Sequence, residues 1–417
     1  RLEPVDQAAW ERGETVDVKK PIIWYVDDAF PAEWKTPIKE GVLVWNRAFE
    51  KIGFKNVLQV RDFPTAEENP EFDPDNLKYS CIRYIPAGVE NAMGPSWTDP
   101  ITGEILNATV LIWHDIIRLV NEWRFVQTAQ VDERVRTEKL PADVLHEALV
   151  YVSAHEIGHT LGLMHNMGAS NAYPVDSLRS ATFTAKYGTT PSIMDYARNN
   201  YVAQPEDKNV VLVQSKIGPA DYYTVQVAYQ PNPEATTQEA DYEIVKKWIA
   251  EKAGDPIFRY GKRQRLLTTF DPTALPNDLG DDALKASTYG IKNLKYILEN
   301  MNDWLDSQDV DFEYRNVLYR YLVYHFEQYL FNVYINIGGF KLNEHFVGDA
   351  MPSFIPLSKD LQKRSLAFVM NELKNMDWID NYNVTKNLAF DGSQARRILQ
   401  TYLIRMQNVT TELFITK

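Results

Sequence analysis

The chain has little of three features that would each point to a particular class of protein. Cys81 is the only cysteine among 417 residues, so a disulfide within the chain and a zinc site built from several thiolates are both excluded. No basic run stands out and the formal net charge is −13, which argues against nucleic acid or an anionic membrane as the main partner. No apolar run approaches the roughly 20 residues that a membrane span requires. We therefore expect no membrane span in this chain.

The single cysteine and the start of the chain allow two further expectations. Cys81 lies in the strand-like run 79–85 and is interpreted as a small buried apolar side chain, with an inhibitory propeptide cysteine as the alternative. Arg1 begins a polar segment in which no signal peptide is visible. Because the chain begins without methionine, we expect it to be part of a longer precursor whose signal and upstream region are absent here.

The most informative stretch runs from His155 to His165 and spells H-E-x-x-H-x-x-G-x-x-H. On a helix, His155 and His159 lie four residues apart and project from one face, so both imidazoles can reach one ion. Gly162 can adopt φ > 0 and end the helix, after which His165 can return as a third ligand. Three neutral imidazoles leave a fourth position for water, as in a catalytic zinc site. Glu156 is then placed to take a proton from that water.

A bare H-E-x-x-H recurs by chance, and the extra residues decide in favour of a metal site. Gly162 and His165 stand at the offsets that a third ligand requires. The nearby pair His146-Glu147 starts in the same way, but position 150 is Val and no second histidine follows. His146 is therefore expected to be an ordinary residue on the same helix.

These residues resemble the zinc-site pattern of the metzincin metallopeptidases. Metzincins carry a tight turn with a methionine beneath the metal, and Ser192–Tyr196 fits that turn with Met194 as its hydrophobic floor. Tyr196 resembles the tyrosine that several metzincin branches keep beside the zinc. Its phenol would ligate the metal or donate a hydrogen bond to the oxyanion of the reaction. In the alternative interpretation, Met194 is a core residue and Tyr196 a surface aromatic.

The pattern of apolar residues predicts the elements that lead to this site. Strands are expected at 21–26, 57–60, 79–85 and 105–113, and helices over 31–52 and from about Pro141 through His155. The resemblance implies an α+β fold, with a metzincin-like catalytic domain built on a mixed, twisted sheet and the active-site helix. We place this domain at 1–215, with a sheet subdomain to about residue 165 and a lower subdomain that holds the methionine turn.

The resemblance also implies where a substrate would bind. In metzincins the strand before the last is an edge strand beside the cleft, and the segment 92–97 would take this place. An extended peptide would add to its backbone, whereas a plain hairpin without a ligand is the alternative. The residues concerned are Ala92, Met93, Gly94 and Ser96. The segment between His165 and Met194 is expected to wall the pocket for the residue after the cut.

Residues 216–417 are predicted to form a mainly helical C-terminal domain packed on the catalytic domain, with a separate carbohydrate- or protein-binding domain as the alternative. Helices are expected over 283–305, 314–337, 358–376 and 393–406. His325 and His345 are expected to be structural. The acidic cluster of Asp278, Asp281 and Asp282 could bind Ca²⁺, but helix N-termini also favour acidic residues, and we favour the helix cap.

The residues around the site further resemble a branch of large bacterial zinc-dependent metalloproteases. The matching stretches are 155–170, 192–207, 217–222 and 278–289. Met164 departs from the branch, where a basic residue is expected, and so does Ala220, where an aromatic is expected. The resemblance implies a secreted or cell-envelope protein of a bacterium.

The sequence therefore predicts a zinc-dependent endopeptidase that uses one catalytic Zn²⁺ and has Glu156 as general base and acid. Three imidazoles also suit other divalent ions. One alternative is a non-catalytic zinc-containing binding module, against which the presence of Glu156 weighs. Another is an exopeptidase or an amidase that acts on cell-wall peptides. A peptide or protein substrate is expected, and a monomer is favoured.

Overall fold

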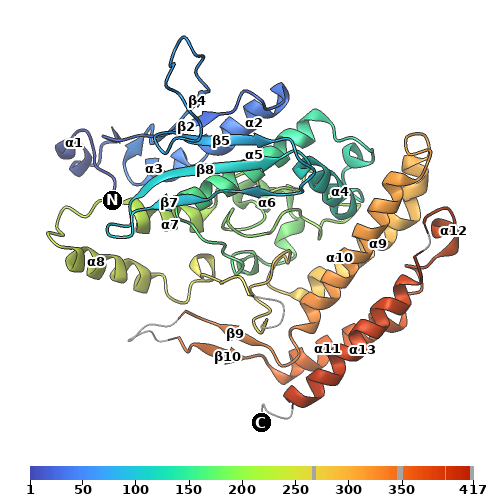
Figure 1. Cartoon of the computed structure of the whole chain (residues 1–417). Helices are drawn as coiled ribbons and strands as arrows, with labels where there is room; N and C mark the ends of the chain where they lie inside the picture. Colours follow the sequence, from blue (N-terminus) through green and yellow to red (C-terminus); the bar gives the residue numbers. More distant parts are fainter. Residues whose placement is uncertain (265–268, 345–350, 390, 414–417) are drawn as a thin grey trace.

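The computed structural model describes the backbone of residues 1–264, 269–344, 351–389 and 391–413, and side chains up to residue 405 within these ranges. Figure 1 shows a sheet with helices packed against it in the first half of the chain and long helices in the second half. The α+β class predicted from the sequence is confirmed. His345, which we expected to be structural, lies outside the described residues.

Strands dominate the first 115 residues. The strands are β1 (Val16–Asp17), β2 (Ile22–Val26), β3 (Phe54–Lys55), β4 (Leu58–Asp62), β5 (Ser80–Ile85), β6 (Ala92–Met93), β7 (Ser96–Thr98) and β8 (Ile105–Trp113). The helices among them are α1 (Gln7–Glu11), α2 (Ala32–Leu43) and α3 (Asn46–Lys51). β2, β4, β5 and β8 correspond to the strands predicted from the sequence.

Helices dominate the remainder. They are α4 (Ile116–Thr128), α5 (Ala142–Thr160), α6 (Ala181–Tyr187), α7 (Pro219–Tyr229), α8 (Gln238–Glu251), α9 (Ala283–Leu305), α10 (Glu313–Tyr334), α11 (Lys359–Lys374), α12 (Tyr382–Thr385) and α13 (Gln394–Leu413). A short hairpin of β9 (Phe340–Leu342) and β10 (Phe354–Pro356) interrupts them. The four helices predicted after residue 280 lie on α9, α10, α11 and α13. Among the described residues, no helix combines the length and the apolar character that crossing a membrane requires.

The main sheet is mixed and places the active-site helix. Its strand order is β4-β2-β5-β8-β6, and β4, β2, β5 and β8 run parallel. β6 and β7 pair antiparallel with β8, so they form the edge of the sheet. α5 packs against α2, β8 and β6. The helix that carries the histidines therefore lies next to this edge (Figure 1).

Two elements differ from the sequence-based prediction, and the first is the helix expected over 31–52. The structure has α2 and α3 there, with a break between them. Trp45, at the break, is fully buried, and its Nε1 donates to the carbonyl of Ala154 on α5 at 2.8 Å. The side chain of Asn46 bonds both the N–H and the carbonyl of Leu58 at 2.9 Å. The break lets one side chain face α5 while the next faces the sheet.

The second difference is α4, which was not predicted. It follows β8 after two residues and packs against α5, α9 and α10. Its apolar residues recur at the three-to-four spacing of a helix, so the signal was present in the sequence. These residues are Ile116, Leu119, Val120 and Trp123.

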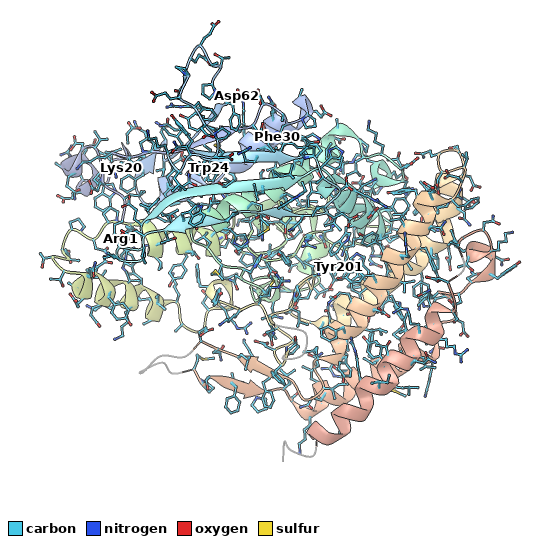
Figure 2. All side chains as sticks on the ribbon, viewed as in Figure 1. Arg1, Lys20, Trp24, Phe30, Asp62 and Tyr201 are labelled. Atoms are coloured by element: carbon cyan, nitrogen blue, oxygen red, sulfur yellow. The ribbon has the colours of Figure 1, made fainter. Side chains whose placement is uncertain are left out.

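Buried apolar side chains form two cores, and Figure 2 labels Trp24 in the first and Tyr201 in the second. The first core lies between the sheet, α2, α3 and α5 and also contains Val225 of α7. The second joins α4 and the chain around Tyr201 to α9, α10 and α11. α7 follows residue 215 and still contributes to the first core. The domain boundary predicted at residue 215 stays a prediction. Cys81 is buried in β5, as expected for a small apolar side chain.

Candidate metal centre

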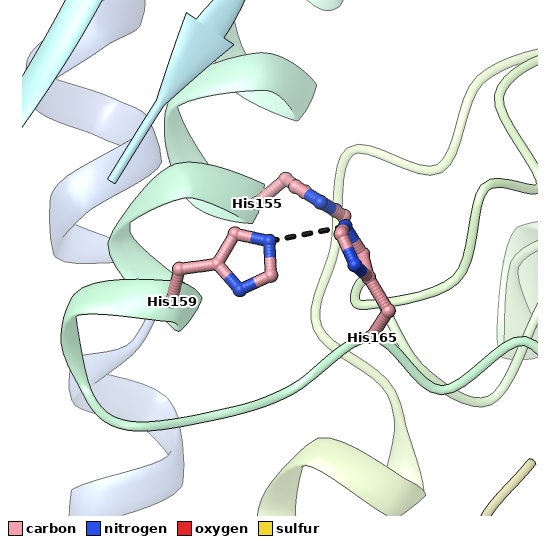
Figure 3. A group of neighbouring side chains, drawn as sticks. All are labelled: His155, His159 and His165. Atoms are coloured by element: carbon pink, nitrogen blue, oxygen red, sulfur yellow. Dashed lines mark hydrogen bonds between the residues drawn. The ribbon is translucent and has the colours of Figure 1, made fainter. Parts of the chain in front are cut away.

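The middle of the chain brings three histidines together through one helix and one turn. α5 is buried along most of its length, and His155 and His159 project from its last turns. Gly162 has φ +84°, and the amide of Leu163 donates back to the carbonyl of Gly158 at 3.1 Å. This left-handed residue ends the helix and reverses the chain. His165 thereby comes to face the two helical histidines (Figure 3).

The spacing of the three imidazoles fits a shared metal ion. One ring nitrogen from each of His155, His159 and His165 lies within 4.8 Å of the others. Nε2 of His159 and Nε2 of His165 are 3.1 Å apart. Two nitrogens that bind one tetrahedral zinc at about 2.0–2.1 Å would be separated by roughly 3.3 Å. The described side chains thus need little movement to hold one ion.

Hydrogen bonds orient two of these rings. Nδ1 of His155 lies 2.7 Å from the carbonyl oxygen of Ile193, and Nδ1 of His159 lies 2.8 Å from that of Leu163. A carbonyl only accepts, so each Nδ1 carries the proton and each Nε2 keeps its lone pair. Nε2 of His155 is buried and has no hydrogen-bond partner among the described residues. A buried acceptor of this kind fits a metal ligand.

Burial also keeps the imidazoles neutral. Removal from solvent lowers the pKa of His155 well below its usual value and lowers the pKa of His159. Burial, with the charges of neighbouring His159, Arg263 and Arg198, lowers the pKa of His165 to about 4. The neutral imidazole is the form that binds a metal.

Glu156 follows the first histidine and is 9 % exposed. Burial raises the pKa of Glu156 to about 7, while the charge of Arg198 and a hydrogen bond from the backbone of Gly94 act in the opposite direction. A Cβ atom on Gly94 would lie 2.3 Å from the carbonyl oxygen of Glu156, so only glycine allows this approach. The edge segment therefore touches α5 at the carboxylate.

Met194 packs beneath the histidines. It is 2 % exposed, and a Cβ atom on Gly158 would lie 2.2 Å from its sulfur. Gly158 lies between Ile157 and His159 on α5, and because it has no side chain, the thioether of Met194 can pack against the helix there. The carbonyl of Met194 accepts from the amide of Asn166 at 3.1 Å, which ties the turn to the residue after His165.

Asp221 on α7 holds this turn in place, and the sequence analysis assigned it no role. Its carboxylate is 1 % exposed and accepts hydrogen bonds from Ser192 Oγ at 2.6 Å, Ile193 N at 2.9 Å and Gly218 N at 2.7 Å. It lies in the stretch 217–222, which only the family resemblance had marked. A lone aspartate in a helix gives no sequence signal for contacts with a turn about 30 residues earlier.

Tyr196 stands beside two of the three histidines. Its ring centroid lies 4.6 Å from that of His165 and 5.5 Å from that of His155. The guanidinium of Arg198 lies 4.4 Å from the Tyr196 ring centroid, and that of Arg263 lies 5.5 Å from it. The tyrosine is therefore placed within the site, with two cations around it.

The segment predicted to bind substrate lies at the sheet edge. Ala92 and Met93 form β6, and Ser96 begins β7. In the part of the chain that the structure describes, both strands pair with β8 alone. Gly94 connects them at the point of contact with α5 described above. The placement leaves one side of the edge open to strand addition, while a bound peptide stays a prediction.

A cavity of about 130 Å³ opens beside Glu156. The walls come from α4, from α5 and from the chain just after Met194. No lining residue falls between His165 and Met194. The expectation that this segment walls the pocket for the residue after the cut stays a prediction. α4, which was not predicted, contributes one part of this wall.

The acidic cluster before α9 caps and packs the helix. Asp282 is the N-cap residue and accepts from the amide of Lys285 at 3.1 Å. Asp281 accepts from Val175 N at 3.1 Å, and Asp278 accepts from Ser170 Oγ at 3.0 Å. The helix-cap interpretation is confirmed at Asp282. The contacts found in the described residues do not support calcium.

The other histidines singled out in the sequence lie outside the site. His146 on α5 is partly exposed, and its Nε2 lies 2.8 Å from Glu40 Oε2. His325 is fully buried, and burial lowers its pKa to about 3. Its ring packs edge-on against Trp123 at 4.8 Å. The two positions at which the sequence departs from the bacterial branch differ in exposure. Met164 is exposed, and Ala220 is buried on α7.

A family model described as Met-zincin matches residues 137–414, about two thirds of the chain. The match includes α5, all three histidines and Met194, and it places the protein in the class of zinc metallopeptidases. The chain belongs to the Met-zincin family, as the resemblance read from the sequence predicted. Neither a curated protein nor a solved structure matches the chain.

Proposed function

We propose that this metallopeptidase is a zinc-dependent endopeptidase in which Glu156 is the general base and acid. The observation that carries the proposal is the position of Glu156. Its buried carboxylate adjoins His155, lines the cavity described above and meets the backbone of the sheet edge at Gly94. The proposed general base, the cavity and the edge of the sheet thus lie next to one another.

The residues of this chain divide the work of hydrolysis. When bound, zinc supplies Lewis-acid chemistry that polarises the scissile carbonyl and lowers the pKa of a water molecule toward about 7. Glu156 accepts a proton from that water and passes it to the leaving amine. The phenol of Tyr196 donates a hydrogen bond to the oxygen on which negative charge develops. The carbonyls of Ile193 and Leu163 keep the imidazoles oriented throughout.

The sheet edge favours internal cleavage of an extended peptide over removal of terminal residues. A substrate strand that adds to β6 would run along the edge past Glu156, with side chains alternating toward and away from α5. An exopeptidase would need a group that binds a chain terminus at one end of this edge.

The proposal includes a secreted or cell-envelope location in a bacterium, which the resemblance of the sequence supports.

The test is cleavage of an unbiased peptide mixture by zinc-loaded wild type and Glu156→Ala, with metal content measured for both. Internal cuts that vanish in the variant while zinc is retained would support the proposal. The matched control is Asp143→Ala, which removes an exposed carboxylate from the first turn of the same helix. Cuts confined to chain termini would favour an exopeptidase. Zinc binding without any cut by the wild type would favour the binding module.

A further inference from the structure

Arg198 has an unusual position in the wall of the cavity beside Glu156. Its guanidinium carbon lies 4.6 Å from the ring centroid of Trp123 and 4.4 Å from that of Tyr196. The residue is half-buried, and both rings and the arginine line the cavity. Two aromatic faces thus hold the guanidinium in place, while among the described residues it forms no ion pair. A cation held in this way is prepared to bind an anion.

The lack of a carboxylate partner stands out in an acidic chain. The protein has 57 acidic and 44 basic residues. The buried arginines Arg124 and Arg315 and the partly buried Arg259 each pair with an aspartate, at 3.3, 2.9 and 2.6 Å. Partial burial of a guanidinium without an ion pair is costly, because its charge loses water. The charge of Arg198 lowers the pKa of nearby Glu156, but the two form no ion pair in the described part of the chain. A carboxylate from a ligand would restore the balance at Arg198.

The other lining residues suit a side chain that is apolar along its length and anionic at its tip. Apolar side chains of α4 and α5 form one large part of the wall. Arg124 also lines the cavity, but its Nη2 already pairs with Asp132 and Glu147, each at 3.3 Å. Its buried Nε and Nη1 have no hydrogen-bond partner in the described parts of the chain. The volume of about 130 Å³ is several times the roughly 30 Å³ of one water molecule, enough for a substrate side chain.

Two carboxylates also line the cavity and oppose an anion. Glu156 lies at the catalytic end. Glu90 already accepts from the hydroxyl of Tyr321 at 3.1 Å and lies 3.9 Å from Arg118, so its charge is compensated. Arg198 is therefore the cation of the cavity wall that has no ion pair among the described residues.

We propose that this cavity receives the side chain of the residue after the scissile bond, and that Arg198 selects aspartate or glutamate there. The inference rests on the proposed function, because it treats the cavity beside Glu156 as a substrate pocket. It assigns a specificity-determining role to a residue that neither holds the metal nor transfers a proton. The free carboxylate of a peptide terminus has the same chemistry, and the test separates it from a side chain.

Binding of two peptide hydroxamates to the zinc-loaded protein tests the inference without turnover. The inhibitors differ only in carrying Glu or Gln as the first side chain after the hydroxamate, and both are amidated at the C-terminus, so no terminal carboxylate is present. The Glu inhibitor is expected to bind wild type about tenfold tighter or more, since bonds between charged groups are the strong ones. Arg198→Gln should bring the ratio close to one.

Arg263→Gln is the matched control. It removes a second cation near Tyr196, but Arg263 is exposed and does not line the cavity, so the ratio should stay high. Equal binding of the two inhibitors to wild type would overturn the inference, whether or not the variants fold. A ratio that survives Arg198→Gln, or falls as far in Arg263→Gln, would also overturn it.

The outcomes separate this inference from the proposed function. Preference for the Glu inhibitor together with no cleavage of any peptide would leave the pocket assignment standing and contradict the endopeptidase. Cleavage of peptides without preference for Glu over Gln would contradict the pocket assignment alone. Failure of both inhibitors to bind the zinc-loaded protein would contradict both.

Discussion

Nδ1 of His155 lies 2.7 Å from the carbonyl oxygen of Ile193, and this contact joins the active-site helix to the methionine turn. The amide of Ile193 in turn donates to Asp221 at 2.9 Å. A chain of hydrogen bonds thus runs from α7 through the turn to His155, the first histidine of the candidate metal centre. Contacts of this kind set the direction in which a ligand nitrogen points, and so affect how well it binds a metal.

The first prediction concerns Asp221→Ala. The change leaves three donors of the turn without their acceptor, so the free energy of unfolding should fall by about 1–3 kcal/mol. Zinc affinity should fall by about 10- to 100-fold, because the His155 ring loses part of its support. Chemical unfolding and competition with a chelator measure the two effects. The control is Asp282→Ala, which removes the cap of α9 and should lower the free energy of unfolding while leaving zinc affinity unchanged. An equal loss of zinc affinity in both variants would contradict the role of Asp221 in supporting the His155 ring.

The second prediction concerns pH. Burial raises the pKa of Asp221 to about 6, while hydrogen bonds from Ser192, Gly218 and Ile193 act to lower it. An aspartate in the unfolded chain has a pKa of about 3.9, so the folded protein binds more protons between about pH 4 and 6. The contribution of this group to the free energy of unfolding therefore falls as pH rises through that window.

Unfolding of the metal-free protein by denaturant across this range measures the effect. Wild type should lose more stability than Asp221→Asn as pH rises from about 4 to 6, and the two slopes should agree above that range. Identical slopes for the two proteins throughout would show that the carboxyl group has no raised pKa in the folded state.

The third prediction concerns Gly158→Ala. The new methyl group would lie 2.2 Å from the Met194 sulfur and 2.8 Å from the Trp45 ring, so the helix or the turn must move. Overpacking of this kind should lower the free energy of unfolding by about 1–3 kcal/mol. Thermal unfolding compares it with Gly88→Ala, where the nearest atom lies 3.4 Å away. Wild-type stability in Gly158→Ala would refute the close packing of Met194 under α5.

The fourth prediction concerns the phenol of Tyr196. Tyr196→Phe keeps the ring beside the histidines and removes the proposed donor to the oxyanion, so kcat should fall about 100-fold. Zinc content should stay unchanged, which separates a role in the reaction from a role in holding the metal. Tyr324→Phe, an exposed neighbour of Trp123, is the control and should retain kcat. Equal kcat values for both variants would remove Tyr196 from the reaction.

The three histidines of the candidate metal centre could be found from the sequence because their geometry is local. His155 and His159 share a helix face by spacing alone, and Gly162 allows the left-handed turn that returns His165. Strands such as β8 and long helices such as α9 were likewise predictable from the periodicity of their apolar residues.

The surroundings of the site depend on contacts between distant parts of the chain. Asp221 reaches the turn at Ser192 and Ile193 only because α7 packs beside α3, and no spacing in the sequence encodes this contact. α4 was not predicted, and it begins at Ile116, with two residues between it and the end of β8. The cavity beside Glu156 depends on the packing of this helix against α5. Arg198 acquires its position from Trp123 on the same unpredicted helix.

Titration of the chelated protein with zinc, followed by the rate of internal peptide cleavage, tests the central claim most directly. The metal-free protein should not cleave, and the rate should rise linearly to one zinc ion per chain and then stay constant. His155→Ala should show no such rise at the same zinc concentrations. Full cleavage by the metal-free protein, or one bound zinc per chain without internal cleavage, would contradict the assignment of a zinc-dependent endopeptidase.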